Sequence, residues 1–120
     1  MYASDSSSNP ASQGRRLIIG KVQHKELAKF PAKVLNEFLV SLEMLEMGLT
    51  PAMEHEKLHA AGKGVIELKR NGRPAYRCMY VIRKSGDVVV LHATRKTTQG
   101  QDRQLIATTA ERLKQLGPDQ

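Results

Sequence analysis

His55, Glu56 and His59 match the H-E-x-x-H pattern of zinc hydrolases, the sharpest chemical motif in the chain. On a helix, two histidines at this spacing lie one turn apart and bind zinc, with the glutamate beside them as a general base. A longer form of the pattern has glycine at the position of Gly62, but it requires a third histidine at the position of Val65. Because the surrounding segment is short and polar, we expect these side chains to lie on a solvated face and to bind no metal. A zinc hydrolase stays as the alternative.

The charge of the chain favours a polyanionic partner. Nineteen lysines and arginines against twelve acidic residues give a net charge of +7 over 120 residues. A surface of this kind attracts nucleic acid or an acidic protein, and charge alone does not choose between them. The length suffices for one modest hydrophobic core without disulfides.

The composition also bears on compartment and domain organisation. The single cysteine, Cys78, cannot form an internal disulfide and fits a reducing cytoplasm. No stretch approaches the roughly 18 consecutive apolar residues that a membrane span needs, so we expect a cytoplasmic protein that does not bind membranes. Residues 1–14 are rich in small and polar types, which predicts a disordered tail ahead of a single domain over residues 15–117.

The first half of the chain predicts one strand and two helices. Residues 16–23 hold an apolar cluster that is too short for a stable helix, and we interpret it as a strand. Apolar residues recur at three- and four-residue spacing over residues 31–47, which predicts the main helix. Thr50 is suited to cap a short second helix that ends at Gly62.

After Gly64 the apolar pattern changes to that of extended chain. It predicts three consecutive antiparallel strands over residues 65–70, 74–84 and 87–94, separated by glycine-containing turns. A final helix begins at its capping residue Asp102 and ends at Gly117. The predicted fold class is therefore α+β: a small antiparallel sheet in the order β-α-α-β-β-β-α, with two N-terminal helices and a C-terminal helix.

Strand alternation predicts which side chains share a face of the sheet, because successive residues point to opposite faces. We expect the set that begins with Tyr76 and Cys78 to pack on the helices, as core residues. The opposite face is expected to be open and concave. Its positive charge comes from side chains on two strands and at the end of the last strand: Lys69, Arg77, Arg95 and Lys96, accompanied by Glu67.

These segments carry a resemblance to a known family. The stretches K-L-H-A-A-G-K-G-V-I-E-L-K, A-Y-R-C-M-Y and V-V-L-H-A-T-R-K-T, between Lys57 and Thr97, resemble the HigB-like, phage-related branch of the RelE/ParE toxins. The resemblance extends upstream through F-P-A-K-V and G-L-T-P and downstream into the last helix, over about residues 17–116. It implies a RelE/ParE-like fold, which agrees with the order of elements predicted above.

The resemblance implies a toxin of a type II toxin–antitoxin system that cuts mRNA on the ribosome. It also implies neutralisation by a cognate antitoxin, often a helix-turn-helix protein, in a hetero-oligomer, and it implies no cofactor. The chemistry would be attack of a ribose 2′-OH on the adjacent phosphate, which needs no metal where cations hold the developing charge. Basic side chains are thus the expected catalysts.

The resemblance further suggests roles for single residues. Arg77 matches the arginine of the family's central strand, and its guanidinium suits bidentate contact with phosphate. Lys96 lies in a segment similar to the family's H-x-x-x-K-K-T, in which Arg95 replaces the more usual lysine and Thr94 stands where an aromatic residue is common. We predict Arg77 and Lys96 as catalytic residues and Arg95 as a phosphate-binding residue.

Three further residues complete the predicted site. His92 has an ordinary pKa near neutrality, so it is predicted to transfer a proton, with a structural role at the strand end as the alternative. Lys57 and Lys69 are predicted to bind RNA phosphates, the groups that most nucleic-acid hydrogen bonds reach, or else to be ordinary solvated lysines.

Two other functions are consistent with the sequence. ParE-type relatives share the fold and inhibit gyrase by protein contact instead of cutting RNA. A degenerate toxin that acts as a binding module for its antitoxin is a further possibility.

Overall fold

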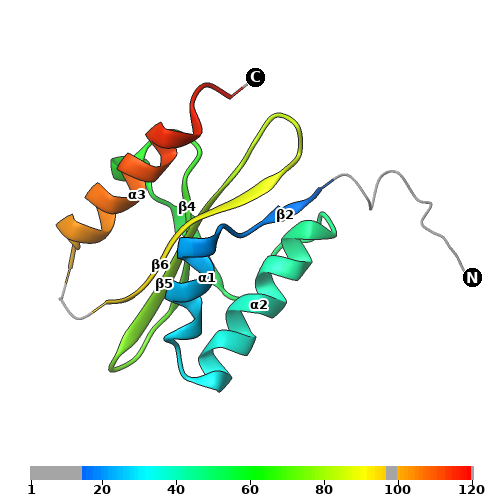
Figure 1. The fold of residues 1–120 in the computed structure, drawn as a ribbon. Helices are drawn as coiled ribbons and strands as arrows, with labels where there is room; N and C mark the ends of the chain where they lie inside the picture. The colour runs from blue at the N-terminus through cyan, green and yellow to red at the C-terminus, as the bar shows by residue number, and fades with distance from the viewer. Residues whose placement is uncertain (1–14, 97–99, 120) are drawn as a thin grey trace, which may run out of the picture.

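The computed structural model describes residues 15–96 and 100–119, and its fold class is the predicted α+β (Figure 1). Three helices and one short 3₁₀ helix flank a five-stranded sheet. In chain order the elements are β2 (Leu17–Ile18), α1 (Lys21–Ala28), α2 (Ala32–Glu46), β3 (Glu54–Lys57), η1 (His59–Ala61), β4 (Ile66–Arg70), β5 (Ala75–Ile82), β6 (Val88–Lys96) and α3 (Arg103–Leu116). The predicted tail over residues 1–14 lies outside the described residues. None of the described helices has the length and apolarity that crossing a membrane requires.

The sheet has the strand order β2-β6-β5-β4-β3. Strands β3 to β6 form antiparallel pairs, and the short β2 pairs with β6 in parallel. The three antiparallel strands predicted after Gly64 are confirmed as β4, β5 and β6. Between β4 and β5 the turn contains Gly72, whose φ of 140° is a conformation that glycine alone adopts readily.

Each face of the sheet packs on helices, and Figure 1 shows α1 and α2 on one side with α3 on the other. The larger core joins α1 and α2 to the sheet through Phe38, Leu42 and the predicted set containing Tyr76 and Cys78. A smaller core joins α3 to the opposite face through Leu105 and residues of β5 and β6. The prediction that this second face is open is therefore wrong for the part that α3 covers.

The helix predicted between Thr50 and Gly62 is wrong. This segment forms the edge strand β3 and the 3₁₀ helix η1. The physical reason is the backbone pairing of this segment with β4 over four positions, and the Lys69 ammonium adds ion pairs at 3.7 Å to Glu54 and 2.5 Å to Glu56. An isolated short helix without an apolar stripe offers no comparable stabilisation.

The strand predicted over residues 16–23 is also partly wrong, because it ends at Ile18 and helix α1 begins at Lys21. Gly20 is the N-cap, and its carbonyl oxygen accepts the first helical hydrogen bond from the His24 amide at 2.9 Å. The number of N-terminal helices is therefore as predicted, but the helix that accompanies the main helix is α1, which precedes it in the chain, and not the segment after Thr50.

The last helix agrees with prediction at both ends. The Asp102 carboxylate accepts a hydrogen bond from the Leu105 amide at 3.0 Å, and Gly117 follows the last helical residue. Gly62 allows α3 to pack closely, because a Cβ atom there would lie 2.5 Å from Leu113 Cδ2. These contacts fix α3 against the sheet.

Candidate functional site

Charged side chains from four strands gather on the side of the sheet that faces α3, and we call this group the charged face. Its members are Glu56 of β3, Glu67 and Lys69 of β4, Arg77 of β5 and Lys96 of β6. They share a side because Glu56 pairs with Glu67 and Lys69 with Arg77 in the strand register. A cleft of about 240 Å³ separates this face from the first turns of α3, and Glu56, Glu67, Lys69 and Lys96 line it.

Arg77 lies beneath this face, with 6% of its side chain exposed, and its partner Glu67 has 9% exposed. Its Nε atom lies 3.3 Å from Glu67 Oε2 without hydrogen-bond geometry, so the contact is an ion pair. The terminal nitrogens donate to the Tyr76 carbonyl oxygen at 2.9 Å and to Asn71 Oδ1 at 3.1 Å. Arg77 is therefore placed to hold Glu67 and the adjoining turn.

The two carboxyl groups of the charged face have pKa values shifted in opposite directions. Burial raises the pKa of Glu67, and the attraction of Arg77, Lys69 and Lys96 only partly offsets this effect. The hydrogen bond from Lys69, followed by its charge, lowers the pKa of the exposed Glu56. Neighbouring carboxyl groups whose pKa values are shifted apart in this way are typical of sites in which one group exchanges a proton and the other stays ionised.

A second charged cluster connects α1, β6 and α3. Glu26 Oε1 accepts hydrogen bonds from Arg112 Nη1 at 2.8 Å and from the Ala93 amide at 3.1 Å, and both carboxylate oxygens lie 3.1 Å from His92 Nδ1. The register between β5 and β6 shifts beside Met79, where β6 contains one extra residue. This bulge places His92 at the cluster.

The protonation states of this cluster follow from its pKa values. Burial lowers the pKa of His92 despite the nearby Glu26. Burial acts to raise the pKa of Glu26, but the hydrogen bonds from Arg112 and Ala93, together with His92, outweigh it and lower that pKa. Because a carboxylate can only accept hydrogen bonds, we assign the Nδ1 proton of a neutral His92 to the contact with Glu26.

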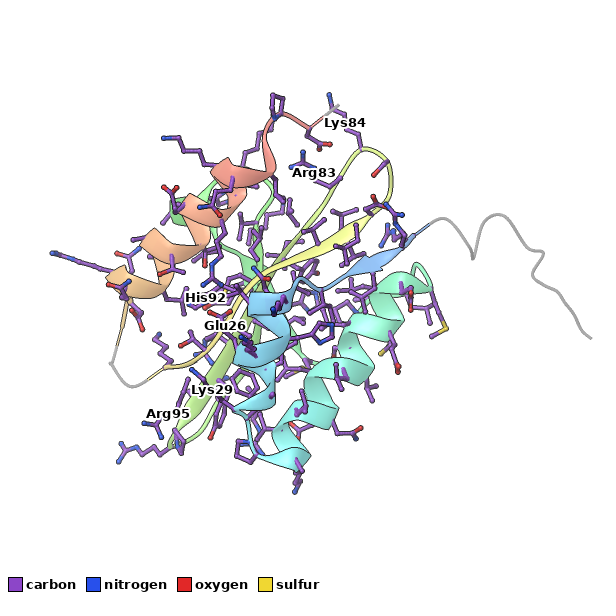
Figure 2. The ribbon with its side chains drawn as sticks, viewed as in Figure 1. Glu26, Lys29, Arg83, Lys84, His92 and Arg95 are labelled. Atoms are coloured by element: carbon purple, nitrogen blue, oxygen red, sulfur yellow. The ribbon has the colours of Figure 1, made fainter. Side chains whose placement is uncertain are left out.

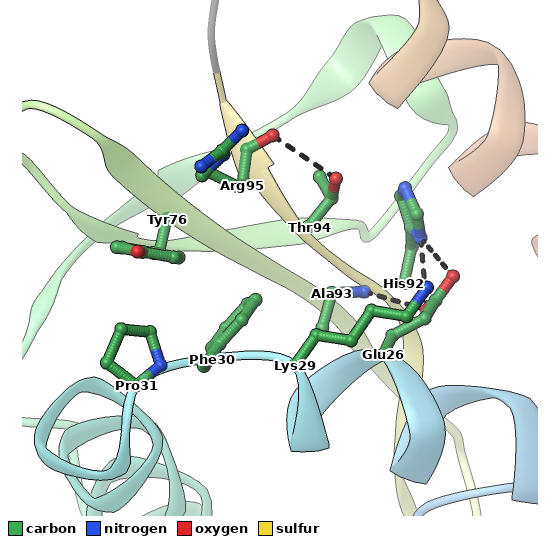
Figure 3. Close-up of a pocket in the computed structure, with 9 residues that line it drawn as sticks. All are labelled: Glu26, Lys29, Phe30, Pro31, Tyr76, His92, Ala93, Thr94 and Arg95. Atoms are coloured by element: carbon green, nitrogen blue, oxygen red, sulfur yellow. Dashed lines mark hydrogen bonds and ion pairs between the residues drawn. The ribbon is translucent and has the colours of Figure 1, made fainter.

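A larger cleft of about 540 Å³ lies between α1 and β6, and we call it the edge cleft (Figure 3). It opens beside the half of β6 that the short β2 does not pair with. Its lining residues come from the end of α1, the turn into α2 and two strands: Glu26, Lys29, Phe30, Pro31, Tyr76, His92, Ala93, Thr94 and Arg95. Figure 3 shows Arg95 and Lys29 on opposite walls, with Tyr76, Phe30 and Pro31 together at one end.

Sequence comparison gives the chain a family. Residues 25–114 match the family described as "Phage derived protein Gp49-like (DUF891)". The chain belongs to this Gp49-like family. The family consists of toxin-like proteins, so the general toxin resemblance in the sequence is confirmed. No curated protein shows a significant sequence match.

The structure of the Gp49-like protein brings three predicted site residues together and leaves three apart. Lys69, Arg77 and Lys96 share the charged face. Lys57 and Arg95 point to the other side of the sheet, since they pair with Ile66 and Tyr76 of the α2-facing set. His92 is on the charged side but belongs to the Glu26 cluster.

Sequence reasoning missed Glu26, Lys29 and Arg112 of the Gp49-like protein. The first two lie on or beside α1, where a single buried residue, Leu27, leaves almost no apolar periodicity to detect. Arg112 lies on a predicted helix, but its partner is 86 positions away in the sequence. Nothing local in the sequence indicates a contact of this range.

The H-E-x-x-H residues of the Gp49-like protein do not lie on a helix. His55 and Glu56 are consecutive residues of β3 and point to opposite faces, whereas His59 starts η1. The His55 ring contacts the Met53 carbonyl oxygen through Nδ1 at 2.9 Å. Within residues 15–96 and 100–119, no three histidine, cysteine or acidic side chains are grouped so as to hold a metal ion.

Proposed function

We propose that this protein is the toxin of a type II toxin–antitoxin system and that it cuts mRNA on the ribosome without a metal ion. One observation carries the proposal: the charged face places two cations and a carboxyl of raised pKa around a single cleft. Membership in a toxin-like family supports the general role. The ribosome and a cognate helix-turn-helix antitoxin as partners follow from the resemblance in the sequence.

The charged face supports a definite division of roles in RNA cleavage. Glu67 accepts the proton of the ribose 2′-OH as this oxygen attacks the adjacent phosphorus; the bond to the 5′-oxygen breaks, leaving a 2′,3′-cyclic phosphate, and the departing 5′-oxygen takes a proton from water. Lys69 and Lys96 stabilise the negative charge that develops on the phosphate oxygens. Arg77 is a positioning residue, because its buried guanidinium holds the Glu67 carboxylate and does not reach the cleft surface.

We assign proton transfer to Glu67 in preference to His92. The two side chains are about equally buried, so their positions decide: His92 contacts Glu26 and lines the edge cleft, on the far side of β6 from Lys69. A base must lie within hydrogen-bond reach of the proton that it takes. Glu67 lines the same cleft as Lys69 and Lys96, so a phosphate held by the two lysines brings the ribose to its side.

The decisive experiment compares wild-type protein with Glu67→Gln during controlled expression, with transcripts mapped by primer extension. We expect the wild type to arrest growth and cut mRNA, and the variant to cut at least about a hundredfold more slowly, the usual loss when a general base is removed. Glu43→Gln is the matched control, since Glu43 is exposed on α2 away from the charged face, and it should behave like the wild type.

The other outcomes separate the remaining functions. Growth arrest with intact transcripts and damaged DNA contradicts the proposal and favours gyrase inhibition. A tight antitoxin complex without any effect on growth favours a binding module. Stoichiometric, tightly bound zinc whose removal abolishes toxicity favours the zinc hydrolase.

A further inference from the structure

We propose that the edge cleft is a second nucleotide-binding subsite, which holds a base and its phosphate where a single RNA strand passes the end of β6. The identity of the ligand rests on the proposed function, but the site lies outside the charged face. Its residues Lys29 and Tyr76 have no part in the cleavage step described above.

The chemistry of the cleft walls fits a nucleotide. Lys29 and Arg95 place two cations on opposite walls, and Thr94 adds a hydroxyl between them. Tyr76 and Phe30 form a tilted aromatic pair with ring centroids 4.9 Å apart; each belongs to the larger core and keeps 7% of its surface exposed, and the exposed Pro31 extends this apolar end of the cleft. A flat base against aromatic rings with cations on its phosphate is the usual way in which proteins hold single-stranded nucleic acid.

The charges within the cleft also favour an anion. Glu26 is the acidic lining residue, and Arg112, His92 and the Ala93 amide already satisfy its carboxylate. Among the residues that the structure describes, neither Lys29 nor Arg95 has a carboxylate within ion-pair distance. Both side chains belong to exposed residues, so their charges are available to a ligand.

The position of Arg95 connects the two clefts. Arg95 and Lys96 are consecutive residues of β6, so their side chains point to opposite faces of the sheet. Lys96 lines the cleft of the charged face, and Arg95 lines the edge cleft. A strand of RNA that crosses the sheet at the end of β6 therefore places one phosphate against Lys96 and a neighbouring phosphate against Arg95.

An acidic peptide is the competing ligand, and the walls favour RNA. A peptide carboxylate would pair with the two cations, but it would leave the aromatic end of a 540 Å³ cleft unfilled. A nucleotide contacts the aromatic end with its base and the two cations with its phosphate.

The test measures binding of a short single-stranded 2′-O-methyl oligoribonucleotide, which lacks the 2′-OH nucleophile and cannot be cut. We expect Lys29→Ala/Arg95→Ala to weaken binding about tenfold or more at physiological salt. The slope of log affinity against log salt should fall in magnitude by about 1.4, the value for two lost phosphate contacts on a single strand. Thermal melting of each variant confirms that it is folded.

The matched control is Lys63→Ala/Lys84→Ala, which removes the same two charges from exposed positions outside both clefts. Figure 2 shows Lys84 at the opposite end of the molecule from Lys29 and Arg95. Binding by this control should stay within about twofold of the wild type. An equal loss in both double variants would mean that net charge alone attracts RNA, and this overturns the subsite.

Three further results also decide the inference. If the cleft variants lose binding to polyglutamate but not to the oligonucleotide, the ligand is an acidic protein and the subsite is overturned. If the wild type cuts mRNA and the cleft variants bind and cut equally well, the inference fails and the proposed function stands. If the wild type cuts no RNA but binds the oligonucleotide through Lys29 and Arg95, the proposed function fails and the subsite stands.

Discussion

At the scale of single residues, the contact between Glu67 and Arg77 decides how the charged face works. Breaking a buried ion pair costs stability because one charge is left without a partner in a poorly solvated place. Here the pair does not fully offset burial, since the pKa of Glu67 is raised even with Arg77 3.3 Å away. The pair therefore leaves Glu67 able to exchange protons nearer to neutral pH than an ordinary glutamate.

We expect substitution of Arg77 to move the pH dependence of cleavage. Arg77 lowers the pKa of Glu67 through its charge, so Arg77→Met should raise that pKa further. A general base works when deprotonated, so the rising limb of the pH–rate profile should shift to higher pH. Arg77→Lys, which keeps the charge, should shift it less. The measurement is the single-turnover cleavage rate across the acid and neutral range.

A different result would assign Arg77 another role. If Arg77→Met lowers the rate by the same factor at every pH, the residue supports the fold or contacts the phosphate and does not tune Glu67. Urea unfolding of both variants separates these possibilities, because only a structural loss lowers the stability without moving the pH profile.

At the scale of elements, Glu26 ties α1 to β6 and α3 through one carboxylate. A hydrogen bond to a charged group contributes about 1.5–3 kcal/mol when it is well shielded from water. We expect Glu26→Gln to lower the free energy of unfolding by about 2 kcal/mol at neutral pH. Urea unfolding measures this loss, and Glu43→Gln on α2 is the matched control, which should change stability little.

The pH dependence of this difference checks its cause. The pKa of Glu26 is lowered in the folded protein, so its contribution is fully present above its unfolded pKa, near 4.5. It is lost as the pH falls through the lower folded pKa. The wild type and Glu26→Gln should therefore converge in stability well below pH 4.5. A difference that stays constant into that range would mean that the substitution disrupts packing instead of the charge network.

The elements also show which parts of the fold the sequence alone predicts. The main helix, β4 to β6 and the last helix were predicted because each has strong periodicity and a turn or cap of known chemistry, such as Asp102. Helix α1 buries only Leu27, and β3 is fixed by cross-strand pairing of Lys69 with two glutamates. Both depend on partners distant in the sequence, which outweigh weak local preference.

The candidate site likewise contains some features that the local sequence predicts and others that depend on distant parts of the chain. Strand alternation correctly placed Lys69, Arg77 and Glu67 on one face, because the period of a strand is local. It could not show that Arg77 is buried, and it did not separate Arg95 from Lys96 because the predicted strand ended at residue 94, whereas β6 continues to Lys96.

At the scale of the whole molecule, two consecutive residues at the end of β6 bring positive charge to two separate clefts. The net charge of +7 attracts any polyanion, but the cations that line the clefts favour binding at these two places. Lys69 and Lys96 lie on one side of the sheet, and Lys29 and Arg95 lie at the edge cleft. In our proposal, these four cations line the path of a single RNA strand.

This path predicts the salt dependence of RNA binding by the whole protein. Four phosphate contacts on a single strand give a slope of about −2.8 for log affinity against log salt, so doubling the salt should weaken binding about sevenfold. Lys69→Ala should reduce the magnitude of the slope by about 0.7. Glu67→Gln should leave it nearly unchanged, because Glu67 contacts no phosphate in the bound state. The measurement is fluorescence anisotropy of a labelled 2′-O-methyl oligoribonucleotide over a salt series. A slope near zero would mean that stacking dominates, and it would contradict a path built from these four cations.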